Sequence, residues 1–335
     1  MTLMSVGDLA KVFTMRRHST ELKQALERFS TESTTGQTAD LSRTVRGDYA
    51  PIAGLHHALT ALDAYKVSTD EASAFAAMLQ QALEAVGTLA SGGAAGLVQS
   101  SMSTNPTQML TAGLDVKQRF FSAVSALNTR VADRTLLAGV RTDGPALAPA
   151  EDILAALRLT TATETTAVGF AAAVTAWFDD PAGYGTVAYL GASTPLAPFQ
   201  IGEGEAVQLT TTANDANLRN TLKGMALGAL VGEGALQSNR VEQRELARLA
   251  GETMLINDSA LTYTRAEIGS AEARIGESAT RNSAESASLQ LAVLAITSVD
   301  PYQAASALQE TQTQLETLYT ITGRLANLHL TDFLR

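Results

Sequence analysis

The sequence predicts a mainly α fold: a long antiparallel helical hairpin or bundle, with paired N- and C-terminal helices and a small mixed α/β insertion domain at its tip. Hydrophobic residues make up 45% of the chain but aromatic residues only 5%. Leu and Ala are therefore expected to pack along the contacts between long helices, in place of a compact core of aromatic side chains. Apolar residues recur at helical spacing near both ends. Prolines gather between Gly139 and Gly204, apart from Pro51, Pro106 and Pro301.

The N-terminal part predicts three helices. The first spans about the first 35 residues, where apolar residues fall at three- and four-residue steps or sums of them. After a break over residues 30–40, Pro51 opens a second helix. The Gly- and Ser-rich stretch 89–104 predicts a turn, and Asn105-Pro106 then supplies a cap and a first-position proline for the third helix.

The middle of the chain predicts a small domain of mixed structure. Residues 186–190 and 206–210 are prone to form strands and are bounded by Gly and Pro. One helix is expected to begin near Pro149 and another near Asp215. Helical spacing returns from about Leu236, and Asp300-Pro301 repeats the cap-and-proline signal before a last helix.

The two terminal helices are expected to pair. A helix of about 35 residues is roughly 50 Å long and cannot cover its own apolar stripe. Pairing the ends gives three predicted domains: 1–45 with 295–335, a coiled-coil assembly domain that is disordered or flexible in the monomer; 46–140 with 235–294, a helical shaft; and 141–234, the insertion. Two thin helices still leave apolar surface for other subunits to cover. The predicted assembly interface comprises Leu9, Val12, Leu22, Leu26, Phe29, Leu308, Leu315, Leu318, Leu325 and Leu328.

Composition excludes several classes of function. A net charge of −10 argues against nucleic-acid binding, because phosphates select for clusters of Lys and Arg. The absence of cysteine excludes disulfide frameworks, thiol catalysis and Cys-ligated zinc. The first residues lack the apolar run of a secretory signal peptide, and no segment has the apolar length of a membrane span. Ordinary targeting signals would therefore leave the chain in the cytosol.

The residues that could carry chemistry form weak patterns. The histidines His18, His56, His57 and His329 show no metal-ligand spacing. The glycines of residues 91–96 and 201–206 lack a phosphate-binding context and predict turns. Asp179-Asp180 before a proline is typical of a solvated turn, and Trp177 of an anchor for the core of the insertion. We therefore expect no catalytic residue, metal or cofactor, and no enzyme.

Four segments resemble the flagellin family, and within it the hook-associated protein of the hook–filament junction. They are the opening helix SVGDLAKVFTMRRHSTELKQALERFSTE, the passage SALNTRVADRTLLAGVRTDGPAL, the segment IGEGEAVQLTTTANDANLRNTLKGMAL, and the closing helix from Ser298 to the apolar finish Phe333-Leu334. The likeness extends over nearly the whole chain and is weakest in the insertion. It implies a structural subunit that joins hook to filament through helix packing between subunits.

The resemblance also implies partners and a location. These are a homo-oligomer in a ring or helix, the hook-side hook-associated protein, flagellin, a cytosolic export chaperone and the flagellar type III apparatus, with neither nucleic-acid binding nor membrane insertion. The subunit would be extracellular, in the flagellum, exported without a cleaved signal peptide. The segment TGQTADLSRTVRGDYAPIAGL lacks the Arg-Ile-Asn phrase usual in main-filament flagellins, although the Leu-Arg ending is shared with them. Main-filament flagellin remains one alternative, and a secreted soluble factor with a site in residues 140–235 is another.

Overall fold

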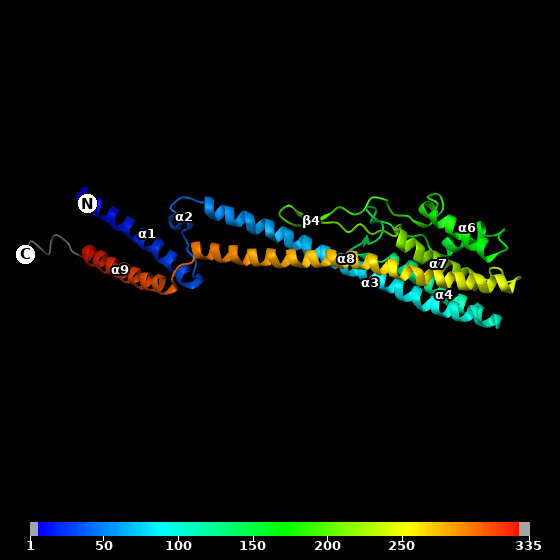
Figure 1. The fold of residues 1–335 in the computed structure, drawn as a ribbon. Helices are drawn as coiled ribbons and strands as arrows, with labels where there is room; N and C mark the ends of the chain where they lie inside the picture. The colour runs from blue at the N-terminus through cyan, green and yellow to red at the C-terminus, as the bar shows by residue number, and fades with distance from the viewer. Residues whose placement is uncertain (1–5, 328–335) are drawn as a thin grey trace, which may run out of the picture. The chain divides into compact units, whose positions relative to one another are not determined.

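The computed structural model describes residues 6–327, with side chains for residues 10–324. The described chain is mostly helical, and its strands form two small two-stranded antiparallel sheets (Figure 1). The mainly α fold class is thereby confirmed. The chain divides into two compact units, one made of residues 1–62 and 284–335 and the other of residues 63–283. The three-domain division drawn from the sequence stays a prediction.

The first unit contains the two terminal helices. Helix α1 (Val6–Thr35) packs against α9 (Pro301–Asn327), and the two run antiparallel (Figure 1). The short helix α2 (Leu41–Thr44) follows α1. The unit also includes the first turns of α3 (Ala50–Ser101) and the last turns of α8 (Arg240–Thr297), helices that each contribute to both units.

The second unit is built on four helices: the remainder of α3 and α8, together with α4 (Pro106–Leu127) and α7 (Ala216–Gly232). Glycines allow these helices to approach closely. A Cβ at Gly228 of α7 would meet Leu97 of α3 and Val116 of α4, and one at Gly224 would meet Met254 of α8. Apolar side chains from all four helices fill the space between them: Leu79, Leu83, Leu97, Phe120, Leu127, Leu222, Met225, Leu246 and Met254.

Residues 128–215 of the second unit carry the remaining elements. Strands β1 (Arg130–Val131) and β2 (Arg134–Thr135) form one hairpin, and β3 (Phe199–Gly202) and β4 (Glu205–Val207) form another. Between them lie α5 (Ala150–Thr160), α6 (Ala167–Asp179) and a π-helix, η1 (Tyr184–Ala188). Trp177 is 9% exposed and lies edge-on to Phe178 with ring centroids 5.2 Å apart. It therefore anchors this part of the core, as predicted.

Several local predictions are confirmed. Asn105 caps α4 by accepting a hydrogen bond from the Thr107 amide (3.0 Å), and α4 begins at Pro106. Asp300 accepts one from the Tyr302 amide (2.9 Å), and α9 begins at Pro301. Helices also start where expected near Pro149 and Asp215.

Two local predictions are wrong. The stretch 89–104 is not a turn, because α3 continues to Ser101 and contains the whole glycine run of residues 91–96. Its small residues face a neighbouring helix: a Cβ at Gly93 would lie 3.0 Å from Val116 of α4. Residues 186–190 do not form a strand either. Residues 186–188 belong to η1, because the Tyr189 amide donates to the Tyr184 carbonyl five residues earlier at 2.8 Å. The side chain of Tyr184 is fully buried, and its hydroxyl donates to the Ala213 carbonyl at 2.6 Å. Helix α6 was not predicted.

Candidate assembly surface

The predicted interface residues of α1 and α9 lie largely on the sides where the two helices face each other. Except for Val12, the predicted interface residues whose side chains are described are half-buried. Because α1 packs against α9, this burial places each apolar stripe against the other helix. The half-buried residues are Leu22, Leu26, Phe29, Leu308, Leu315 and Leu318. Val12 is 40% exposed. The side chains of Leu9 and Leu325, and all of Leu328, lie outside the described residues. These positions therefore hold the pair together, and their part in contacts between subunits stays a prediction.

The register of the pair is fixed at both ends. Near the chain termini, the Thr322 hydroxyl lies 4.0 Å from the Met15 sulfur. At the opposite end, Gln37 and Ser298 form an isolated antiparallel bridge. There the Thr38 amide donates to the Thr297 carbonyl at 2.8 Å, and the Val299 amide donates to the Gly36 carbonyl at 2.9 Å. The chain therefore joins its two terminal helices by backbone as well as by side chains.

The turn that ends α1 is also fixed by hydrogen bonds. Gly36 has a φ of +67°, a left-handed conformation that glycine adopts without steric cost, and its amide closes the helix on the Glu32 carbonyl at 2.9 Å. The Glu32 side chain is 7% exposed and accepts a hydrogen bond from the Ala39 amide at 3.2 Å. Asp40 then caps α2 through the Arg43 amide at 3.1 Å.

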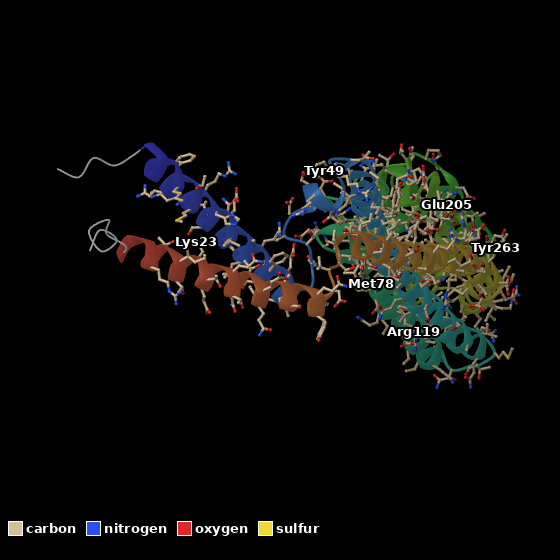
Figure 2. The ribbon with its side chains drawn as sticks, turned by 90° about the vertical axis from the view of Figure 1, so that its left-hand side faces the viewer. Lys23, Tyr49, Met78, Arg119, Glu205 and Tyr263 are labelled. Carbon is tan, nitrogen blue, oxygen red and sulfur yellow. The ribbon has the colours of Figure 1, made fainter. Side chains whose placement is uncertain are left out.

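The helix pair covers its apolar residues incompletely. Among the described side chains of α1, only Glu32 is fully buried, and the apolar ones are half-buried or exposed. Figure 2 shows side chains standing clear of both helices on their outer sides. Phe13 is 71% exposed and Ile321 46% exposed. The exposed apolar and aromatic residues of this unit are Val12, Phe13, Tyr49, Leu291, Leu294, Tyr302, Tyr319 and Ile321.

These outer residues were largely missed by the sequence reasoning. The apolar stripe with the strongest periodicity is, on a helix pair, the side that the partner helix covers. The remaining apolar residues, Phe13 and Ile321 among them, lie off that stripe. Groups of exposed apolar side chains are typical of surfaces that bind other proteins. The sequence does show apolar residues on more than one side of each terminal helix, and this pattern would have indicated a second apolar surface.

Charge contributes little to the contact between α1 and α9. The ion pairs described in this unit join neighbours on α1, namely Arg17 with Glu21 at 3.4 Å and His18 with Glu21 at 3.3 Å, and all of these side chains are mostly exposed. No ion pair joins α1 to α9 within residues 10–324. Exposed pairs contribute only about 0.2–1 kcal/mol. Apolar and small polar side chains therefore stabilise the helix pair.

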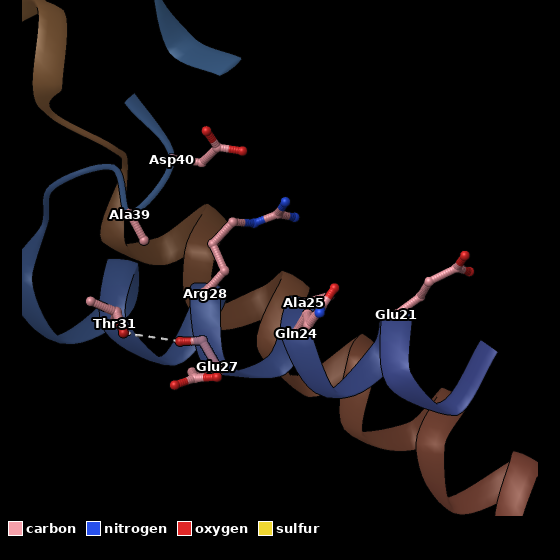
Figure 3. A pocket seen from close by; sticks show the side chains of 8 residues that line it. All are labelled: Glu21, Gln24, Ala25, Glu27, Arg28, Thr31, Ala39 and Asp40. Atoms are coloured by element: carbon pink, nitrogen blue, oxygen red, sulfur yellow. Dashed lines mark hydrogen bonds between the residues drawn. The ribbon is translucent and has the colours of Figure 1, made fainter. Parts of the chain in front are cut away.

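An open hollow of about 630 Å³ lies on the outer side of α1, beside the connection to α2 (Figure 3). Arg28 projects from α1 on this side, and its guanidinium lies 4.4 Å from the centre of the Phe29 ring. The wall of the hollow is mainly polar: Glu21, Gln24, Ala25, Glu27, Arg28, Thr31, Ala39 and Asp40.

In the second unit, four charged groups tie α4, α5 and the end of α7 together. Lys117 of α4 lies 2.7 Å from Glu233, which follows α7, and Arg158 of α5 lies 3.0 Å from the same carboxylate. Arg158 also binds Glu151 at 3.0 Å, and this hydrogen bond, together with Lys117, lowers the pKa of the Glu151 carboxyl. The hydrogen bond to Glu233 raises the pKa of Lys117. The network stabilises the docking of α5 on the four-helix core.

The other candidate residues serve local structure or remain at the surface. His56 and His57 are exposed on α3, and His329 lies outside the described residues. Asp180 accepts a hydrogen bond from the Ala182 amide at 2.9 Å, in the turn predicted for the acidic pair. Within residues 10–324, no group of three or more His, Asp and Glu side chains is arranged to hold a metal ion. No helix of the described chain has the length and apolarity needed to cross a bilayer.

Known proteins resemble this chain both in sequence and in fold. Residues 256–334, which include α8 from Ile256 onward and all of α9, match the family of the bacterial flagellin C-terminal helical region. This C-terminal part of the chain is similar to the corresponding region of bacterial flagellins. The flagellin-family resemblance seen in the sequence is thereby confirmed. No curated protein matches the sequence significantly.

Solved structures share the fold of this flagellin-like chain. The crystal structure of FlgL from Bacillus cereus is 12% identical, with a TM-score of 0.53, and the match covers 72% of this chain and 100% of that one. A Vibrio parahaemolyticus protein assigned as flagellar hook-associated is 13% identical, with a TM-score of 0.52, covering 74% of this chain and 98% of that one. At such low identity these matches establish a common fold.

Proposed function

We propose that this flagellin-like chain is a non-enzymatic structural subunit of the bacterial flagellum, which joins the hook to the filament. The observation that carries the proposal is the terminal helix pair, whose outer sides expose apolar residues such as Phe13 and Ile321. The flagellin C-terminal region and the fold shared with FlgL support it. Copies of the chain would cover these outer sides when they pack side by side.

The proposed mechanism is geometric. Identical subunits pack through contacts between different faces, and such contacts close into a ring or continue as a helix. The partners would be further copies of this chain, the hook-associated protein on the hook side and flagellin on the filament side. The subunit would reach the outside of the cell through the flagellar type III apparatus without a cleaved signal, after a cytosolic chaperone has covered its C-terminal helix.

Substitutions on the outer sides of the terminal pair test the proposal. Phe13→Ser and Ile321→Ser remove exposed apolar side chains, so the monomer should keep its far-ultraviolet circular dichroism and its unfolding midpoint. Both variants should lose assembly, seen as loss of motility in cells that lack the native gene and as loss of the subunit from isolated hook–filament complexes. Leu159→Ser, at an 82% exposed position of α5, is the matched control and should assemble normally.

Deletion of residues 306–335 gives a second test. It removes most of α9 and should leave a folded, exported subunit that cannot assemble. Normal motility after this deletion, or in the Phe13 and Ile321 variants, would reject the mechanism. The amount of protein in sheared filaments separates the alternative role, because main-filament flagellin would form nearly all of the mass and a junction subunit only a trace.

A further inference from the structure

A hollow of about 340 Å³ lies in the second unit. It is bounded by the end of α6, the π-helix η1, the loop after η1 and the start of α7. Its volume falls at the lower end of the roughly 300–1,000 Å³ typical of small-molecule sites. The lining residues are Asp179, Asp180, Pro181, Gly185, Tyr189, Gly191, Ser193, Asn214 and Arg219.

Arg219 has unused hydrogen-bonding capacity in this wall. Its Nη1 donates to the Phe178 carbonyl at 3.1 Å, and its Nε is shielded from solvent without an acceptor. No ion pair joins Arg219 to either neighbouring aspartate in the described part of the chain. A buried N–H group without an acceptor costs about 1–3 kcal/mol. The Phe178 carbonyl accounts for one of the guanidinium N–H groups, and Arg219 lines the hollow.

Other polar groups around the hollow are also available. Within residues 10–324, the side chains of Asp179, Ser193 and Asn214 make no hydrogen bond to the rest of the chain. Asp180 uses one carboxylate oxygen to accept from the Ala182 amide. The wall therefore offers acceptors from two carboxylates, donors from a guanidinium, and both kinds from a hydroxyl and an amide.

The frame that holds these groups is fixed. The Tyr189 hydroxyl donates to the Ala192 carbonyl at 2.7 Å, which holds the loop over residues 189–192. The buried Tyr184 hydroxyl donates to the Ala213 carbonyl at 2.6 Å, which ties η1 to the segment before α7. Short π-helical segments are frequent at functional sites. Because the walls are already ordered, a ligand would lose little binding energy in organising them.

We propose that this hollow binds a neutral carbohydrate. A free anion would meet the two carboxylates, and a cation would meet Arg219. Sugar hydroxyls instead donate to Asp179 and accept from Arg219 without adding charge, and Ser193 and Asn214 can serve either role. The site lies in the insertion and is independent of the assembly role proposed for the terminal helices.

Saturation-transfer NMR with the full-length protein tests the proposal, with glucose, galactose, mannose and N-acetylglucosamine as probes. At least one of these sugars should receive saturation and show a dissociation constant in the millimolar range. Asp179→Asn removes a charged acceptor and should weaken that binding about tenfold, and Asn214→Ala should weaken it also. Asp143→Asn makes the same charge change at a loop position outside the hollow and should leave binding unchanged.

Three results would overturn the proposal. The first is the absence of saturation transfer to all four sugars. The second is equal weakening by Asp179→Asn and Asp143→Asn, which would indicate a general effect of charge. The third is tighter binding of a zwitterion such as alanine than of any sugar. Unchanged fluorescence of Trp177 in each variant verifies that the fold around the hollow is intact.

Discussion

Gly113 of α4 and Gly232 of α7 bring two helix backbones into contact, and a methyl group at either position should separate the helices. A Cβ on Gly113 would lie 2.6 Å from the Cα of Gly232 and 3.0 Å from the carbonyl carbon of Val231. The amide nitrogen of Gly232 lies closer still, and ordinary contacts of this kind begin at 3.4 Å, so the helices would have to move apart by about 1 Å. The obstructing atoms are backbone, which cannot rotate away.

The expected cost follows from two opposing terms. Overpacking a close interface costs typically ~1–3 kcal/mol, and the contact between two backbones places Gly113→Ala at the upper end. Alanine is a better helix former than glycine by ~1 kcal/mol, which offsets part of this cost. A methyl group at Gly96 of α3 would meet no atom within 4 Å, so Gly96→Ala should show the gain alone. Because the helix-forming gain is common to both variants, they should differ by the overpacking cost alone, about 2–3 kcal/mol.

Urea and thermal unfolding measure this difference. Trp177 is the only tryptophan and is buried in the second unit, so its fluorescence reports the unfolding of that unit. For a unit of this size, 1 kcal/mol corresponds to ~2–4 °C in Tm, so Gly113→Ala should melt about 4–12 °C below Gly96→Ala. Equal unfolding midpoints for the two variants would show that a methyl group fits between α4 and α7, and the close contact of their backbones at Gly113 and Gly232 would then be wrong.

Two further predictions concern the second unit. Tyr184→Phe removes the hydroxyl that donates to the Ala213 carbonyl and leaves that carbonyl unpaired, so the free energy of unfolding in urea should fall by ~1–3 kcal/mol, whereas Tyr263→Phe at a 64% exposed position should change it little. Because Arg158 and Lys117 lower the pKa of Glu151 in the folded state, the stabilisation from this carboxylate is present above its unfolded pKa and is lost as the pH falls through the folded value. Glu151→Gln should therefore lower the free energy of unfolding at pH 7 by the ~0.2–1 kcal/mol of an exposed ion pair, and with it Tm slightly. This difference should shrink as the pH is lowered below the unfolded pKa, and a difference that does not change with pH would refute this origin.

The helices that the sequence predicted best begin with local signals. Asn105-Pro106 and Asp300-Pro301 each supply a capping side chain and a proline at the first helical position, and both helices start there. The stripes of α1 and α9 repeat over many turns, so their pairing followed from spacing. These features depend on neighbours in sequence, which a single chain displays directly.

The failures arose where tertiary packing overrides local preference. The glycines of residues 91–96 weaken a helix in isolation, yet in α3 they admit the side chains of α4. The β-prone residues 186–190 follow the buried Tyr184, whose hydrogen bond to Ala213 holds the π-helix. Helix α6 carried a usable signal, since Thr166 caps an Ala-rich segment through the Gly169 amide. The hollow that contains Arg219 joins segments distant in sequence, so its composition became visible only in the fold.

The bridge between Gln37 and Ser298 has a mechanical consequence. Tension applied along α1 or α9 reaches this crossing, and two backbone hydrogen bonds there pass part of the load to the opposite segment of the chain. The bonds lie across the direction of pulling, so both must shear together before α1 and α9 can slide past one another. A chain whose two ends share the strain in this way resists being drawn out by one of them alone.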